Sequence, residues 1–296
     1  MPYFSTFDPR DEAAALATIA RIDALSTHHD VEHAGVRVRW RRFGGDHGDE
    51  GRAPLVLLHG GHGCWMHWLR NAEALSAGRT LWLPDMSGFH DSDAPPPARP
   101  DQHPLDPLLD ALAGSLDRLV GAGTAIDLGG FSFGGLVASR LGARRGGIRR
   151  LALVGSGGHG GVRRMTVEMI NWRAAADRDE ERAALLHNLA ALMLHEPAAI
   201  DALAYAIHDL SCHATRFRSK EVSLAGGLQA ALEAIGGPQL LLWGAHDVTA
   251  DAPVLVPQLL AGHPQRRGVV LEGAGHWAQF ERADAVNGAL LEFLEG

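Results

Sequence analysis

The chain has few cysteines, no long apolar run and no recognisable targeting segment. Its only cysteines, Cys64 and Cys212, form neither a CxxC pair nor a set of short spacings, which is typical of a reducing compartment rather than a disulfide framework. No apolar run approaches the ~18 residues needed to span a bilayer, and the first residues lack the basic region and apolar core of a secretion signal. We therefore expect a cytoplasmic protein that does not bind a membrane.

Positive charge is also scarce. The sequence has 27 Lys+Arg against 35 Asp+Glu, a formal net charge of −8, and no basic run is longer than Arg-Arg. A surface that binds a phosphate backbone needs clustered basic residues, so we expect no nucleic-acid partner. Hydrophobic residues make up 46% of the chain and charged residues 21%, which indicates a folded globular protein. Whether it forms a homo-oligomer is left open.

Short apolar runs alternate with longer helical patterns over most of the chain. The runs occupy residues 55–58, 81–83, 125–128, 151–154, 240–243 and 269–271. Their hydrophobicity is continuous rather than alternating, which indicates burial on both faces, as in a parallel sheet covered by helices. In such a sheet, functional residues are expected just beyond the carboxyl ends of the strands.

Three units are predicted along the chain. Residues 1–30 are expected to form a helical extension, and residues 31–43 a hairpin that opens the main domain. Residues 160–237 are rich in Ala, Leu and charge, show helical periodicity and contain no convincing strand. Because a crossover connection needs far fewer residues, this segment predicts a helical cap over the strand ends. The α/β core then consists of residues 31–159 and 238–296.

A serine between two glycines follows the run at residues 125–128. The sequence Gly130-Phe131-Ser132-Phe133-Gly134 has the G-x-S-x-G pattern, which places the serine on a sharp turn from strand to helix. The glycines avoid Cβ clashes in such a turn, and the helix N-terminus favours developing negative charge. Ser132 is therefore the predicted nucleophile.

A serine hydroxyl needs an imidazole base and a carboxylate that orients the imidazole. On this fold the expected chain order is Ser, acid, His. Asp247 follows the run at 240–243, and His276 follows the run at 269–271, so both lie at strand ends in the required order. Asp251 is the alternative acid, and His246 is expected to point elsewhere.

Two backbone N–H groups are expected to stabilise the oxyanion of a tetrahedral intermediate. One belongs to Phe133, the residue after the nucleophile, and the other to Gly61 in the glycine-rich loop that follows the run at 55–58.

A metal site formed by His59, His62 and His67 is an alternative reading of the same loop. No carboxylate or cysteine completes a ligand set at suitable spacing, so we expect no metal and no cofactor.

With these residues in place, the sequence resembles the α/β-hydrolase family from about Val31 to the C-terminus. The segment Pro84–Ser92 is similar to the family's P-D-x-x-G-x-G-x-S loop, with His90 in place of the second glycine. The segment Gly275–Asp284 resembles the meta-cleavage-product hydrolases, which hydrolyse a C–C bond of vinylogous diketo acids. The resemblance implies a mostly parallel, doubly wound α/β sheet with an inserted helical cap.

Four residues are predicted to bind substrate. Phe131 and Trp277 flank Ser132 and His276 in sequence and are expected to form apolar walls, and His62 lies in the oxyanion loop. The resemblance implies that a cap arginine, here Arg216, holds a substrate carboxylate.

The predicted activity is cofactor-independent serine hydrolysis of a small, partly apolar carboxylic ester. C–C cleavage of a ring-fission diketo acid is the alternative. The C–C hydrolases often have asparagine before the nucleophile, whereas Phe131 cannot donate a hydrogen bond. A scaffold that binds a ligand without catalysis is the second alternative.

Overall fold

The computed structural model describes residues 7–45 and 51–296. Within them lies an eight-stranded sheet of order β1-β2-β4-β3-β5-β6-β7-β8. The strands are β1 (Ser26–His33), β2 (Val36–Phe43), β3 (Leu55–Leu58), β4 (Leu81–Pro84), β5 (Ile126–Phe131), β6 (Ile148–Val154), β7 (Gln239–Gly244) and β8 (Arg266–Leu271). The β1–β2 hairpin and its pairing with β4 are antiparallel, and the other pairs are parallel. Each predicted run forms one of β3 to β8, so the predicted α/β class is confirmed.

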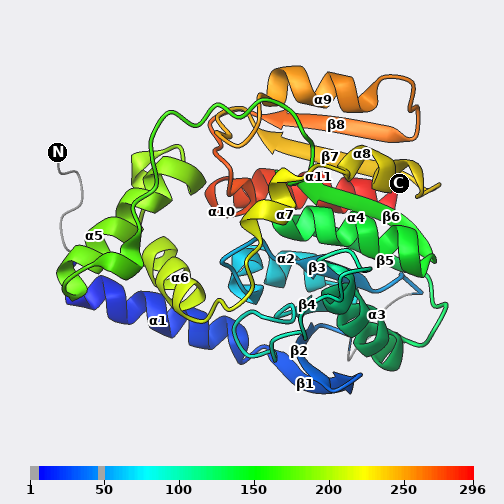
Figure 1. Ribbon diagram of the computed structural model, residues 1–296, viewed down its shortest axis with the longest axis horizontal. Coiled ribbons are helices and arrows are strands. Elements are labelled where there is room, and N and C mark those ends of the chain that lie inside the picture. The colour runs from blue at the N-terminus through cyan, green and yellow to red at the C-terminus, as the bar shows by residue number, and fades with distance from the viewer. Residues whose placement is uncertain (1–6, 46–50) are drawn as a thin grey trace.

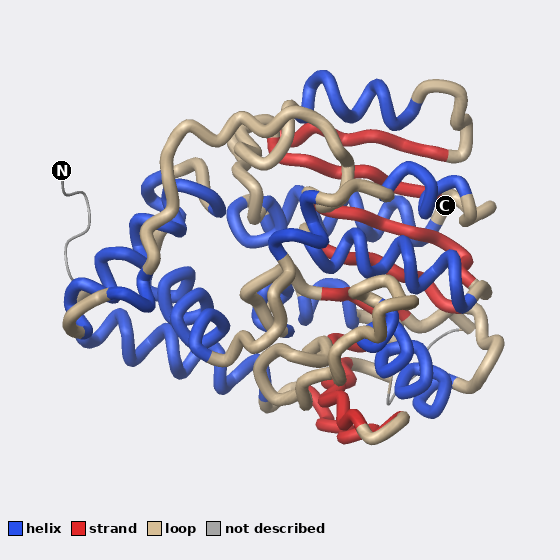
Figure 2. Tube along the Cα trace, viewed as in Figure 1, coloured by secondary structure: helices blue, strands red, loops and turns tan. Residues whose placement is uncertain are grey.

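Helices cover both faces of the sheet (Figure 2). They are α1 (Pro9–Asp23), α2 (Ala72–Ser76), α3 (Asp106–Val120), α4 (Phe133–Arg145), α5 (Arg178–Asn188), α6 (Ala202–His213), α7 (Lys220–Leu224), α8 (Leu228–Glu233), α9 (Ala252–Leu260), α10 (Ala278–Glu281) and α11 (Ala283–Glu295). Alternate residues of a strand point to opposite faces. Leu55 and Leu57 accordingly join the core beside α10 and α11, whereas Val56 and Leu58 join the core beside α3, α4 and α9. Burial on both faces explains the continuous apolar runs.

The predicted end of the N-terminal extension, residue 30, is wrong. Helix α1 ends at Asp23, and β1 begins at Ser26, where it pairs in register with Phe43. The start of β1, Ser26-Thr27-His28-His29-Asp30, is polar because this edge strand is largely exposed. It therefore lacks the apolar pattern by which sequence reasoning recognises a strand.

Between β6 and β7 the described chain forms helices and loops without a strand, in line with the expectation for residues 160–237. The last of these helices, α8, packs against α4, and its Leu228 and Leu232 lie in the core of the main domain. A helical pattern alone cannot distinguish such a core helix from a cap helix. The predicted cap segment, which ends at residue 237, therefore includes one helix of the main domain, α8. The cap as a unit stays a prediction. No helix in the described ranges is long and apolar enough to cross a bilayer.

Helix α1 lies beside helices α5 and α6 of the segment between β6 and β7 (Figure 1). Arg182 of α5 connects the three helices. It forms an ion pair with Glu12 of α1, and its guanidinium lies 4.6 Å from the centroid of the Tyr205 ring of α6. The N-terminal helix therefore supports the helices over the strand ends.

Replacement of Arg182 by Met is expected to lower the free energy of unfolding by about 1 kcal/mol, because it removes one ion pair and two cation–π contacts, with Tyr205 and Phe7. Urea denaturation would measure the change. Arg118→Met, on the exposed side of α3, serves as the control and should stay within about 0.5 kcal/mol of the wild type. Equal effects of the two substitutions would contradict this role of Arg182.

Candidate active site

Ser132 occupies a sharp turn between β5 and α4. Its φ is +54°, a left-handed conformation that few non-glycine residues adopt. A Cβ on Gly130 would lie 2.2 Å from the carbonyl oxygen of Gly134, and a Cβ on Gly134 would lie 2.2 Å from that of His59. Only glycine fits at both positions, so the two glycines permit the turn.

The structure brings the three predicted triad residues together in one hydrogen-bonded row. His276 Nε2 lies 2.9 Å from Ser132 Oγ, and His276 Nδ1 lies 2.8 Å from Asp247 Oδ2. Asp247 follows β7 and is buried, and its Oδ1 accepts hydrogen bonds from the backbone N–H and the hydroxyl of Thr249, each at 2.7 Å. A Cβ on Gly155 would lie 3.2 Å from both Asp247 Oδ2 and His276 Nδ1, so this residue leaves room for the pair.

Asp251, the alternative acid, and His246, the neighbour of Asp247, both contact residues outside the triad. Asp251 precedes α9 and forms an ion pair with Arg164 at 3.5 Å. His246 stacks on His195 of the cap, with ring centroids 3.6 Å apart, so it does point elsewhere.

The two predicted oxyanion donors lie next to each other. A Cβ on Gly61 would be 3.6 Å from the Cβ of Phe133. Neither backbone N–H donates to an acceptor among the described residues, so both are available to a ligand. The loop also contains His62, whose φ is +52°.

A cavity of about 450 Å³ opens over Ser132 and His276. Gly61, Phe133, Phe131 and His62 line it, as the sequence predicts for substrate-binding positions and oxyanion donors. Residues of the segment between β6 and β7, among them Met169 and Trp172, add apolar surface to it. A partly apolar cavity with a few polar groups is typical of a small-molecule site.

The predicted places of Trp277 and Arg216 are wrong. Neither residue lines the cavity. Trp277 is fully buried behind it, where its indole Nε1 donates to the carbonyl oxygen of His67 at 3.0 Å. The exposed Arg216 donates to the carbonyl oxygens of His90 and Ser92. Adjacency to a catalytic residue, or a place within the cap segment, does not determine where a side chain points.

Two cations that sequence reasoning missed line the cavity instead. They are Arg163, in the loop after β6, and Lys220, at the start of α7. Neither forms an ion pair in the described part of the chain, and no Asp or Glu of that part lines the cavity. The only sequence feature that indicates a role for Arg163 and Lys220 is their positive charge, and it does not show that they line the cavity.

The oxyanion loop is anchored by His59. The backbone N–H of Met86 donates to its Nε2 at 2.9 Å, and its Nδ1 donates to the carbonyl oxygen of Gly60 at 2.8 Å. Burial lowers the pKa of His59 to about 4, so the ring is neutral. In the described ranges, three candidate metal ligands meet only at Asp85, His90 and Asp91, and the ring nitrogens of His59, His62 and His67 do not meet in this way.

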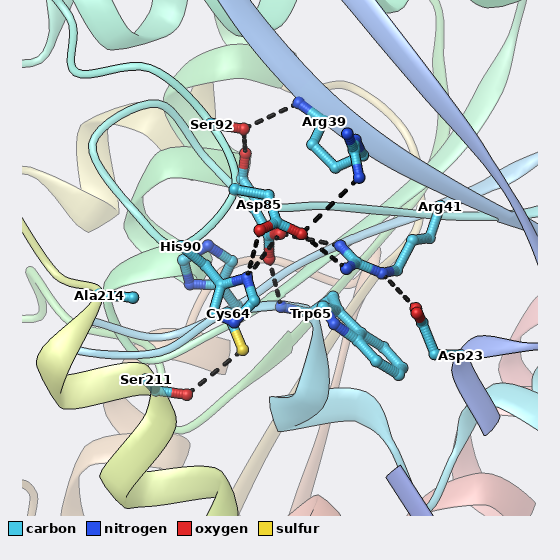
Figure 3. A network of polar contacts seen from close by, with 12 residues as sticks. Asp23, Arg39, Arg41, Cys64, Trp65, Asp85, His90, Ser92, Ser211 and Ala214 are labelled. Carbon is cyan, nitrogen blue, oxygen red and sulfur yellow. Dashed lines mark hydrogen bonds and ion pairs between the residues drawn. The ribbon is translucent and has the colours of Figure 1, made fainter. Parts of the chain in front are cut away.

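Asp85, which follows β4, is the centre of a polar network beside the loop (Figure 3). Its buried carboxylate accepts from Arg41 of β2 at 2.8 Å and from the backbone N–H of Trp65 at 2.9 Å. It also pairs with His90 at 3.4 Å. The backbone N–H of His90 donates to Ala214 of the cap segment at 3.1 Å. The network therefore connects the hairpin, the oxyanion loop and the cap segment.

The comparisons with known proteins agree with this geometry. Residues 55–289 match the model of the alpha/beta hydrolase family. The chain belongs to this family. It is 30% identical to the dihydrolipoyllysine-residue acetyltransferase component of an acetoin cleaving system from Pseudomonas putida, over 89% of this chain and 68% of that protein.

Two further proteins to which the chain is similar are named as hydrolytic enzymes. The chain is 31% identical to a 2-hydroxy-6-oxononadienedioate/2-hydroxy-6-oxononatrienedioate hydrolase from Pseudomonas putida, over 83% of this chain and 89% of that protein. An esterase from Rhodococcus sp. ECU1013 has the same fold, with a TM-score of 0.71 and 22% identity over 92% of this chain and 99% of that chain. The hydrolase fold and a hydrolytic activity thus characterise this chain.

The His90 network makes stability depend on pH. Burial by itself lowers the pKa of His90, but Asp85 and Asp91 outweigh it and raise the pKa to about 9. Because this value exceeds the ~6.5 of an unfolded chain, the stabilisation is full below about pH 6.5 and is lost as pH rises through 9. The free energy of unfolding should therefore fall more between pH 6 and pH 9.5 in the wild type than in His90→Asn. Asparagine suits the left-handed φ of +40°. Urea denaturation at both pH values checks this, and equal falls would contradict it.

Proposed function

We propose that the protein is a cofactor-independent serine hydrolase that cleaves a small, partly apolar carboxylic ester through an acyl-enzyme on Ser132. The observation that carries this proposal is the row Ser132–His276–Asp247, with distances of 2.9 Å and 2.8 Å, at the floor of a cavity. The fold shared with an esterase supports it.

The geometry supports the following steps. His276 Nε2 takes the proton of Ser132 Oγ as the oxygen attacks the ester carbonyl. The N–H groups of Gly61 and Phe133 stabilise the oxyanion, while Asp247 stabilises the imidazolium. The imidazolium then protonates the leaving alcohol, and an acyl-serine remains. A water molecule, deprotonated by His276, hydrolyses it to the carboxylic acid and restores Ser132.

C–C hydrolysis of a ring-fission diketo acid is a second candidate. Arg163 and Lys220 line a cavity to which no described Asp or Glu contributes, and this charge favours a substrate carboxylate. The relative from Pseudomonas putida that is 31% identical to this chain is by its name a hydrolase of 2-hydroxy-6-oxononadienedioate and 2-hydroxy-6-oxononatrienedioate. Phe131, at the position before the nucleophile, has no donor for an enolate oxygen.

Ser132→Ala should abolish ester turnover and labelling by a fluorophosphonate, with a loss of order 10⁴ or more in kcat/KM because triad members act as a unit. Asp247→Asn should lose activity to a comparable order, because the amide favours the wrong imidazole tautomer. p-Nitrophenyl esters of graded chain length would measure turnover, and circular dichroism would check folding.

Asp251→Asn is the matched control and should retain most of the activity, since Asp251 has no contact with His276. Absence of fluorophosphonate labelling in the wild type would favour a scaffold that binds without catalysis. A larger loss in Asp251→Asn than in Asp247→Asn would overturn the assignment of the acid.

The two cavity cations should discriminate between substrates. In the double variant Arg163→Gln/Lys220→Gln, KM should rise about 3- to 10-fold for p-nitrophenyl hemiglutarate, which carries a carboxylate, relative to p-nitrophenyl pentanoate, because exposed ion pairs contribute modestly. Arg216→Gln, which lies outside the cavity, should change neither KM. If the double variant leaves the ratio unchanged, the substrate carboxylate and with it the C–C hydrolase candidate lose their support.

A further inference from the structure

A serine hydroxyl from the segment after α6 lies against the oxyanion loop and has no role in the mechanism above. Ser219 directly precedes helix α7, is only 3% exposed and lines the cavity together with Gly61 and Phe133. A Cβ on Gly61 would lie 2.3 Å from Ser219 Oγ and 3.6 Å from the Cβ of Phe133. The hydroxyl therefore lies beside the two residues whose backbone N–H groups are the expected oxyanion donors.

The close approach of Ser219 explains why residue 61 has no side chain. Glycine is needed where φ is positive or where another group comes close to the backbone. Gly61 is not among the residues with a positive φ, so the course of its backbone does not itself require glycine. A Cβ at this position would instead overlap the side chain of Ser219, at 2.3 Å from Oγ and 3.2 Å from Cβ. The loop thus leaves room for this hydroxyl beside an oxyanion donor.

The hydroxyl of Ser219 has no hydrogen-bond partner in the described part of the chain, and it does not cap α7. It is nevertheless not among the unpaired side-chain atoms that are sealed from solvent, so the oxygen opens into the cavity that the residue lines. Two other hydroxyls nearby in the chain have partners: Ser211 Oγ contacts Cys64 Sγ at 3.3 Å, and Thr215 donates to the carbonyl oxygen of Ser211 at 2.8 Å. A hydroxyl left unpaired in a protein interior costs free energy, and a ligand oxygen beside Gly61 would satisfy it.

Contacts on both sides of Ser219 fix its place. The backbone N–H of Phe217 donates to the carbonyl oxygen of Gly88 at 3.1 Å, and the Phe217 ring packs against the ring of Phe133, with centroids 5.7 Å apart. On the other side, the carbonyl oxygen of Ser219 accepts from the backbone N–H of Ser223 at 3.0 Å. The main domain therefore holds the hydroxyl next to Phe133, and a group that stabilises developing charge acts best when it is held in advance.

We propose that Ser219 is a catalytic residue whose Oγ–H donates a third hydrogen bond to the oxyanion, beside the backbone N–H groups of Gly61 and Phe133. This proposal rests on the proposed hydrolase function. As Ser132 Oγ bonds to the carbonyl carbon, its proton passes to His276, the π electron pair moves to the carbonyl oxygen, and the Ser219 hydroxyl donates to that oxygen. Hydrogen bonds to a charged acceptor are stronger than those to a neutral one, so Ser219 stabilises the transition state more than the bound substrate.

The test uses two ketone inhibitors that separate stabilisation of the oxyanion from ordinary binding. Ser132 adds to 1,1,1-trifluoro-4-phenylbutan-2-one and forms a hemiketal oxyanion, which resembles the tetrahedral intermediate. The methyl ketone 4-phenylbutan-2-one occupies the cavity without this addition. The quantity of interest is the ketone ratio, the inhibition constant of the methyl ketone divided by that of the trifluoromethyl ketone, with p-nitrophenyl pentanoate as the substrate.

Two substitutions of Ser219 test the hydroxyl itself. In Ser219→Ala we expect kcat/KM to fall about 10- to 100-fold, at or below the usual loss for one oxyanion donor because two backbone donors remain. The ketone ratio should fall by a similar factor, whereas the inhibition constant of the methyl ketone should change by less than about 3-fold, because that ketone forms no oxyanion. Ser219→Thr keeps the hydroxyl and should keep the ketone ratio within about 3-fold of the wild type. Circular dichroism would check the folding of both variants.

Ser223→Ala is the matched control for the ketone ratio. Ser223 also lines the cavity and lies one turn further along, on α7. Its side chain lies against Gly157 rather than Gly61, since a Cβ on Gly157 would be 3.5 Å from Ser223 Oγ. We therefore expect this substitution to affect both ketones alike and to leave their ratio unchanged.

Three outcomes would overturn the role of Ser219 as a third donor. They are a wild-type ketone ratio in Ser219→Ala, a fall of the ratio in Ser219→Thr as large as in Ser219→Ala, and an equally large fall in Ser223→Ala. Failure of the hydrolase function itself would appear separately, in the wild type: the trifluoromethyl ketone would bind no more tightly than the methyl ketone, and a fluorophosphonate would not label Ser132.

Discussion

The left-handed backbone at Ser132 is the constraint on which the site depends. A φ of +54° at a residue with a side chain is unfavourable, and it persists because Gly130 and Gly134 allow strand, turn and helix to approach within distances that a Cβ would exclude. One turn therefore has three effects. It directs Oγ toward His276, begins α4 with the free N–H of Phe133, and places Phe131 in the cavity wall. Nucleophile and oxyanion donor are thus positioned by the same local geometry.

The sequence predicts most of the core because burial leaves a direct pattern there. Strands β3, β4 and β7 are buried along their whole length because helices cover both faces of the sheet, so most of their residues are apolar in succession. The first residues of strand β1, 26–30, escape prediction because the strand lies at the edge of the sheet, where half of its residues are exposed. The packing of α8 in the core of the main domain could not be predicted from the sequence either. A helix that packs on α4 and a helix that packs over the cavity have the same apolar periodicity. The hydrophobic pattern of a sequence indicates which residues are buried, but it does not indicate against which element they pack.

The same distinction separates the predictable part of the site from the rest. Ser132, Asp247 and His276 each follow a strand whose end is recognisable, so the topology of the sheet brings them together. The cavity wall is built by elements whose relative placement the sequence does not show. Trp277 therefore turned out to lie behind the wall, and Arg163 and Lys220 were missed.

The distribution of charge around the cavity is consistent with hydrolysis. The buried carboxylate of Asp85 is neutralised by Arg41 and His90 on the far side of the oxyanion loop, and His59 and His67 hold the loop as uncharged rings. The cations are confined to the exposed residues Arg163 and Lys220. A cation at the floor would attract a substrate carboxylate toward Ser132 in the ground state, whereas catalysis requires groups that act most strongly in the transition state. Neutral donors beside the nucleophile and charges at the exposed rim separate turnover from substrate capture.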